Sequence, residues 1–157
     1  MTDFSTLYKK YAPEVFRFAL YLSGERGQAE DITSETFVRA WTAPEPIEVT
    51  TVKGYLFTIA RNLFLQGLRT RSRHVQLDQE LRDPQPSPYA QAEQKAEFRA
   101  MLVGLQKLPE IDRAALLMRA LDAMPYEEIA RALGISLSSV KVKIHRARLA
   151  LVGIRNA

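Results

Sequence analysis

Two segments of the chain carry basic side chains with no acidic residue among them, and these side chains are best suited to bind a polyanion. The first segment, Val49 to Leu77, has five basic residues, and the second, Ile129 to the C-terminus, has six. Arginine and lysine bind phosphates, and arginine can also pair with a guanine edge. The formal net charge is only +4, so the positive charge is concentrated locally. The distribution supports two contact zones on one polyanion.

The second basic segment has the pattern of a helix-turn-helix. Residues 125–133 are predicted to form a short helix with Pro125 at the first helical position. Proline lacks an N–H, but no hydrogen bond is lost there, because the first N–H groups of a helix have no partner within it. Gly134 is predicted to be the left-handed residue that ends this helix. Ser136 can then accept a bond from a free backbone N–H and start a second helix. A short helix, a tight turn and a longer helix are typical of modules that place the second helix in the DNA major groove.

In the second helix, apolar residues recur at spacings of four, three and four and predict a buried stripe of Val140, Ile144, Ala147 and Leu151. The opposite face carries Ser138, Lys141, Val142, His145 and Arg146. Lys143 and Arg148 flank the stripe and suit phosphate contacts. An ordinary amphipathic helix with a solvated basic face would show the same charges. The agreement of turn, cap and stripe favours a DNA-reading helix.

The first basic segment interleaves aromatic side chains with basic ones and one amide, Asn62, between Gly54 and His74. Aromatic rings stack on unpaired bases, and an amide can bind a base edge. Phe57 and Phe64 could equally be core residues, because aromatic residues at helical spacing usually pack inward. The combination favours a second contact with nucleic acid.

The composition argues against other kinds of site. There is no cysteine, so disulfides and thiolate metal sites are ruled out, and a reducing compartment fits. His74 and His145 are far apart, so we expect no metal and no other cofactor. We see no nucleophile–base–acid set or phosphate-binding glycine loop, and we expect no enzyme. There is no apolar run long enough to span a bilayer and no signal-peptide core, so we expect a cytoplasmic protein without membrane insertion.

The periodicity elsewhere predicts an all-α fold of two small helical domains. Prolines at positions 84, 86 and 88 indicate a linker between them. The expected division is a domain at 1–73, a linker at 74–87 and a domain at 88–157. The expected helices before the helix-turn-helix are Phe4–Leu22, Gln28–Trp41, Val52–Arg71, a helix from the region of Ser87 to Leu108, and one opened by Pro109 and ending near Leu121.

Three blocks of the sequence resemble a known family. AEDITSETFVRAW (Ala29 to Trp41), GYLFTIARNL (Gly54 to Leu63) and YEEIARALGIS with VKVKIHRAR (Tyr126 to Arg148) are similar to the extracytoplasmic-function (ECF) sigma factors in order and separation. The resemblance covers almost the whole chain. It implies a specificity subunit of bacterial RNA polymerase that directs promoter recognition and transcription initiation. It also implies core polymerase, promoter DNA and an anti-sigma factor as partners, and we expect a monomer when the protein is free.

The resemblance also implies roles for individual residues. The helix around Asp31, Glu35 and Val38 would dock on core polymerase, which agrees with their place opposite Ala29, Thr33, Phe37 and Ala40. The loop from Thr42 to Thr51 and the helix after it would capture a flipped base of the minus-ten element, because a base cannot be read on its Watson–Crick edge inside a duplex. The residues implied for this contact are Lys53, Arg61, Asn62, Arg69 and Arg71. Those implied for the minus-thirty-five element are Ser138, Ser139, Lys141, Val142, Lys143, His145, Arg146 and Arg148.

The sequence departs from the family at three positions. Met124 and Pro125 replace a leucine and a capping serine, so the first helix of the helix-turn-helix is expected to begin differently. Val142 stands where a small polar residue is common. Valine cannot donate a hydrogen bond to a base but can contact a thymine methyl group.

Two other kinds of protein could share some of these features. A sigma mimic that only captures an anti-sigma factor would not need the basic recognition face, and would be expected to carry a receiver domain. A dimeric helix-turn-helix regulator would not explain the two blocks near the N-terminus. Both explain fewer of the residues than a sigma factor does.

Overall fold

The computed structural model describes residues 3–42, 47, 49–71 and 89–156 of the 157-residue chain, and their side chains apart from those of 68–71, 89–94 and 154–156. Within these ranges there are seven helices and no strand, so the predicted all-α fold is confirmed. The predicted linker, residues 74–87, lies outside the described residues. The helices are α1 (Phe4–Ser23), α2 (Arg26–Thr42), α3 (Val52–Arg71), α4 (Tyr89–Gln106), α5 (Glu110–Asp122), α6 (Tyr126–Leu133) and α7 (Leu137–Asn156).

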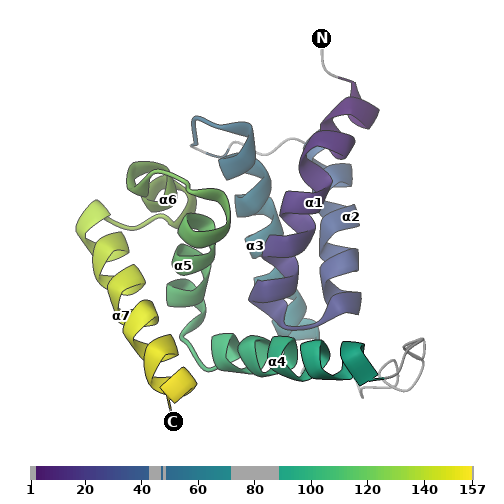
Figure 1. The fold of residues 1–157 in the computed structure, drawn as a ribbon. Helices are drawn as coiled ribbons and strands as arrows, with labels where there is room; N and C mark the ends of the chain where they lie inside the picture. The colour runs from purple at the N-terminus through teal and green to yellow at the C-terminus, as the bar shows by residue number, and fades with distance from the viewer. Residues whose placement is uncertain (1–2, 43–46, 48, 72–88, 157) are drawn as a thin grey trace.

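Helices α1, α2 and α3 pack side by side and form an N-terminal lobe (Figure 1). Its core includes Phe18 of α1 and Phe57 of α3, whose rings stack with centroids 4.6 Å apart. Phe57 and Phe64 are both buried. The structure therefore decides between the two interpretations of these aromatics: they are core residues and do not present their rings to a nucleic acid.

Helices α5, α6 and α7 form the C-terminal lobe, and α6 and α7 are the predicted helix-turn-helix. Gly134 ends α6 with a φ of +69°, and Ser136 Oγ accepts a bond from the N–H of Ser139 at 3.2 Å, so both terminal signals are confirmed. Val140, Ile144 and Ala147 are buried, and Leu151 is half-buried. The predicted stripe therefore fastens α7 to the lobe.

The prediction that Pro125 is the first helical residue was wrong. Pro125 is extended, with a ψ of 145°, and lies just before α6 as its N-cap. Its carbonyl oxygen accepts from the N–H of Ile129 at 3.0 Å, which is the first bond of the helix. Pro109 occupies the same position before α5. A proline there has no side-chain acceptor for the free N–H groups, but its preset φ suits the entry into a helix.

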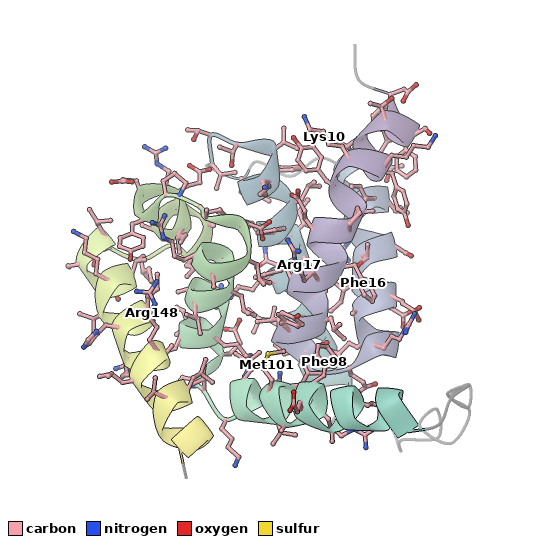
Figure 2. All side chains as sticks on the ribbon, viewed as in Figure 1. Lys10, Phe16, Arg17, Phe98, Met101 and Arg148 are labelled. Atoms are coloured by element: carbon pink, nitrogen blue, oxygen red, sulfur yellow. The ribbon has the colours of Figure 1, made fainter. Side chains whose placement is uncertain are left out.

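The two lobes pack directly against each other. Helix α1 contacts α4 and α5, α3 contacts α6, and one continuous cluster of apolar side chains runs through both lobes. Helix α4 runs across one end of the N-terminal lobe and leads into α5 (Figure 1). Phe98 and Met101 lie on the side of α4 that faces the other helices (Figure 2), and the Phe98 ring is 5.9 Å from that of Tyr21. Helix α3, which carries the residues predicted to bind the minus-ten element, therefore lies against the C-terminal lobe.

Candidate nucleic-acid interface

The predicted recognition face of α7 lies on the surface. Helix α7 is at the outer edge of the C-terminal lobe, away from α1–α3 (Figure 1), and Arg148 lies along it (Figure 2). Val142 is 57% exposed, which fits a contact with a thymine methyl group better than a core role. Lys143 and Ser139 are half-buried at the flank of the helix. The other members of the predicted set, Ser138, Lys141, His145, Arg146 and Arg148, are all exposed.

Arg146 has a partner that the sequence did not indicate. Its Nε and Nη2 atoms donate to the two carboxylate oxygens of Asp112 in α5, at 2.8 and 2.9 Å. The Asp112 side chain is 1% exposed, whereas that of Arg146 is 56% exposed. The hydrogen bonds and the charge of Asp112 raise the pKa of Arg146 further above its usual range. The guanidinium thus lies on the surface and covers a buried carboxylate.

The residues predicted for the minus-ten element lie on α3, and two of them, Lys53 and Arg61, contact the C-terminal lobe. Arg61 donates from Nε and Nη2 to the two carboxylate oxygens of Glu110, at 2.8 and 2.7 Å. Asn62 is half-buried beside it. Arg69 and Arg71 belong to the last turns of α3, but their side chains lie outside the described residues.

Lys53 lies near the start of α3 between two acidic side chains. Its Nζ is 3.0 Å from Glu14 Oε2 of α1 and 3.6 Å from Asp122 Oδ1 of α5. Arg17, which lies between α1 and α5 (Figure 2), has its Nη2 3.9 Å from the same Asp122 oxygen. Burial lowers the pKa of Lys53, but the two carboxylates outweigh it and the pKa is raised. Burial also raises the pKa of Asp122, and the two cations oppose that effect. Lys53 is thus charged and held at the boundary.

The loop that precedes α3 is bound to α6 through Glu128. The Oε1 atom of Glu128 accepts from the N–H of Thr50 at 2.9 Å and of Thr51 at 3.2 Å, and Oε2 accepts from the Thr50 hydroxyl at 2.8 Å. Burial tends to raise the pKa of Glu128, but these bonds outweigh it and the pKa is lowered. Gly54 permits this approach, because a Cβ there would lie 2.8 Å from Glu128 Oε1. The sequence did not indicate this contact, because Thr50 and Glu128 are 78 residues apart.

The residues predicted to dock on core polymerase share the outer face of α2. Asp31, Glu35 and Val38 are all exposed, and Val38 is exposed by nearly half. Glu35 Oε2 accepts from Arg39 Nε at 3.1 Å one turn along the same helix. Such an exposed pair contributes little to stability and would be displaced at low cost. The structure brings these three side chains together, away from the recognition face of α7.

Two further features are absent from the part of the chain that the structure describes. Within it, no cluster of histidine, aspartate or glutamate side chains has a geometry that could hold a metal ion. None of the described helices is long and apolar enough to cross a membrane.

Comparison with known families agrees with this arrangement. Residues 7–74 match the family model of sigma-70 region 2, and residues 98–151 match that of sigma-70 region 4. The two matches correspond to the N-terminal lobe and to the larger part of the C-terminal lobe.

Similar curated proteins are ECF sigma factors. SigE of Mycolicibacterium smegmatis is 33% identical over 94% of this chain, which spans 60% of SigE's own length. SigM of Bacillus subtilis is 31% identical over 96% of the chain and 93% of SigM. SigL of Mycobacterium tuberculosis is 35% identical over 92% of the chain and 84% of SigL.

Two solved structures share the fold. The sigma factor RpoE of Bartonella quintana, in complex with the anti-sigma factor NepR, superposes with a TM-score of 0.78 at 25% identity, over 100% of this chain and 99% of that one. CnrH, in complex with the cytosolic domain of CnrY, superposes with a TM-score of 0.72 at 22% identity, over 98% of this chain and 87% of that one. On its two family regions and its curated relatives, the chain belongs to the ECF sigma factors, the subunits that direct bacterial RNA polymerase to promoters and start transcription there.

Proposed function

We propose that this sigma factor makes three separate contacts: α2 with core polymerase, α3 and the loop before it with the minus-ten element, and α7 with the minus-thirty-five element. The observation that carries the proposal is the surface of α7. Its exposed side chains are basic, hydroxyl-bearing or apolar, with no acidic residue from Ile129 to the C-terminus, on a helix held in a helix-turn-helix. Duplex DNA is the partner that this surface fits best.

On α7, the position of each side chain suggests its role. Lys141, Val142, His145 and Arg146 are exposed on the face that would enter the major groove and are proposed to contact base edges. Ser138 and Ser139 lie in the first turn, where free N–H groups also suit a phosphate. Lys143 and Arg148 are proposed to bind phosphates and to set the register of the helix on the duplex.

On α3, the proposed minus-ten contact requires a rearrangement. Lys53 and Arg61 are bound to carboxylates in the arrangement of lobes described above. Promoter DNA would replace those carboxylates with phosphates, which are the same kind of acceptor for a guanidinium. We therefore propose that the lobes separate when Lys53, Arg61, Asn62, Arg69 and Arg71 bind the unpaired strand.

The proposed polymerase contact is formed by Asp31, Glu35 and Val38. Two acidic side chains beside an exposed valine suit a basic surface with an apolar centre. Domains at 1–73 and 88–157 with a linker at 74–87 would allow α2 and α7 to bind sites far apart on one assembly. The positions of the two family matches, 7–74 and 98–151, support these boundaries.

The proposed setting follows from the family. We propose that the protein acts in the cytoplasm, is monomeric when free, and initiates transcription without catalysing a reaction itself. Because a relative with the same fold binds an anti-sigma factor, we also propose an anti-sigma factor as its regulator.

A run-off transcription assay tests the proposal. Purified chain would be added to bacterial core polymerase with a template that carries the DNA upstream of its own gene. We expect a transcript with a defined start site that requires both core and this chain. The core preparation would be shown to be active with another sigma factor. If that control succeeds and this chain yields no transcript from any tested upstream region, the proposed function is wrong.

A further inference from the structure

The ion pair between Arg146 and Asp112 joins a buried carboxylate to an exposed guanidinium. Asp112 is almost wholly buried and receives two parallel bonds, yet the arginine that donates them is more than half exposed. The exposed guanidinium therefore has surface left for a second partner.

The neighbouring arginine shows how a structural arginine looks in this lobe. Arg113 is 5% exposed, and its Nη1 donates to the carbonyl oxygens of Leu105 and Leu108 at 3.2 and 3.1 Å. Burial lowers the pKa of Arg113, whereas the pKa of Arg146 is raised. Arg113 is thus buried and Arg146 exposed, and their pKa values are shifted in opposite directions. This holds although Arg113 is next in sequence to Asp112, the partner of Arg146.

The geometry of the pair leaves one edge of the Arg146 guanidinium unused. The bonds to Asp112 take Nε–H and one hydrogen of Nη2. The second hydrogen of Nη2 and one hydrogen of Nη1 lie side by side along the next edge, and the second hydrogen of Nη1 points away from it. Two parallel donors on that edge match the O6 and N7 acceptors that guanine presents in the major groove. One guanidinium can therefore bind Asp112 and a guanine at the same time.

Resting on the proposed role of α7, we infer that Asp112 is a positioning residue for promoter recognition. It holds one edge of Arg146 so that the other edge is presented to a single guanine in the minus-thirty-five element. A guanidinium held in this way loses less conformational freedom on binding than a free one. Asp112 thereby determines sequence preference without contacting DNA, from a helix that lies outside the helix-turn-helix.

The experiment measures sequence preference with the reconstituted holoenzyme. Transcription would be measured from a set of promoters in which each upstream base pair is changed in turn. We expect the wild type to require guanine at one position. Asp112→Asn keeps the shape but loses the charge and one acceptor, and should reduce that preference by roughly three- to ten-fold. Arg146→Ala should abolish the preference at the same base pair, and the double variant should be no worse there than Arg146→Ala alone.

Two further variants separate positioning from a general structural role. Arg146→Lys keeps a cation beside Asp112 but cannot bind two partners through parallel edges, so it should fold and lose the guanine preference. Glu110→Gln removes the charge and one of the two acceptors of the other two-bond pair on α5, and should leave the upstream preference unchanged. Thermal unfolding of each variant would report whether the fold is intact.

Several results would overturn the inference. Asp112→Asn could lower transcription from all promoters by one common factor, which would make the pair only a structural tie between α5 and α7. It could strengthen the guanine preference, which would mean that Asp112 competes with DNA for Arg146. If Asp112→Asn does not fold, a full guanine preference in Arg146→Lys contradicts the inference instead. The inference is also contradicted if the wild type initiates at defined promoters without preferring guanine at any single position. If the wild type never initiates, the proposed function is contradicted instead.

Discussion

Arg61 of α3 and Glu110 of α5 form a two-bond ion pair across the boundary between the lobes, with Nε–Oε2 and Nη2–Oε1 distances of 2.8 and 2.7 Å. The Arg61 and Glu110 side chains are mostly buried, so water screens the pair only partly. Together with the bonds from Thr50 and Thr51 to Glu128, the pair ties the proposed minus-ten surface to the C-terminal lobe.

Glu110→Gln should weaken the association of the lobes. It leaves the Arg61 guanidinium without a charged partner, and we expect the free energy of unfolding to fall by about 1–3 kcal/mol. The released Arg61 should bind unpaired minus-ten DNA more tightly than in the wild type. Urea unfolding and fluorescence binding to a pre-melted promoter strand would measure the two effects. Glu127→Gln, an exposed change in α6, should alter stability by no more than about 0.5 kcal/mol. Unchanged stability and unchanged strand binding in Glu110→Gln would show that the pair does not restrain the lobes.

The contact between Glu128 and Thr50 and Thr51 should depend on pH. Because the pKa of Glu128 is lowered in the folded protein, its carboxylate stabilises the fold above about pH 4.3, the ordinary value for glutamate. That stabilisation is lost as the pH falls from there through the folded pKa. We expect Glu128→Gln to be less stable than the wild type by about 1–3 kcal/mol at pH 7, and the difference to shrink towards pH 3. Urea unfolding at several pH values would test this. A difference that is constant from pH 7 to pH 3 would contradict a role for the charged carboxylate.

Reversal of charge on α2 should impair the polymerase contact alone. Asp31→Lys with Glu35→Lys replaces two exposed carboxylates, so the helical content should be unchanged while binding to core polymerase is strongly reduced. A pull-down with core polymerase and far-ultraviolet circular dichroism would measure both. Glu97→Lys with Glu127→Lys makes the same change in charge at exposed positions of α4 and α6, and should still bind core. Equal capture of both double variants would place the docking face elsewhere.

Lys143 and Arg146 should affect binding to the minus-thirty-five element in different ways. Lys143 lies half-buried at the flank of α7, so Lys143→Ala should weaken binding to all sequences alike and lower the salt slope by about one unit. Arg146→Ala should act mainly on the preferred sequence, by roughly ten-fold or more. Promoter binding by holoenzyme at several salt concentrations would separate the two. Since Arg146→Ala also leaves the buried Asp112 unpaired, its folding would be checked in parallel. A loss that depends equally on sequence in both variants would contradict the assignment.

Asn62 should matter only after the promoter strands separate. Asn62→Ala should leave binding to upstream duplex intact and impair formation of the open complex, because Asn62 lies in the lobe proposed to bind the unpaired strand. Potassium permanganate footprinting on duplex and on a pre-melted promoter bubble would show at which step the defect arises. A defect in upstream duplex binding as large as that of Arg146→Ala would disprove the division of work between the lobes.

Local features of the sequence were sufficient to predict the helices and the recognition face. The stripe of Val140, Ile144 and Ala147 depends on spacing along one helix, and Gly134 and Ser136 act on neighbouring backbone groups. The outer face of α7 followed directly, because a residue opposite a buried stripe must be exposed. The order of the three sequence blocks was sufficient for the family.

Only the tertiary structure decided which charged or polar side chains from different elements pair with one another. Arg146 and Asp112 are 34 residues apart, Arg61 and Glu110 are 49 apart, and Thr50 and Glu128 are 78 apart. The burial of Phe57 and Phe64 likewise depends on how α3 packs against the other helices. Periodicity shows which face of a helix is buried, but the distance between two helices depends on the packing of all of them. For that reason the sequence could place Arg146 on the surface proposed to contact DNA but could not indicate that it is bonded to Asp112.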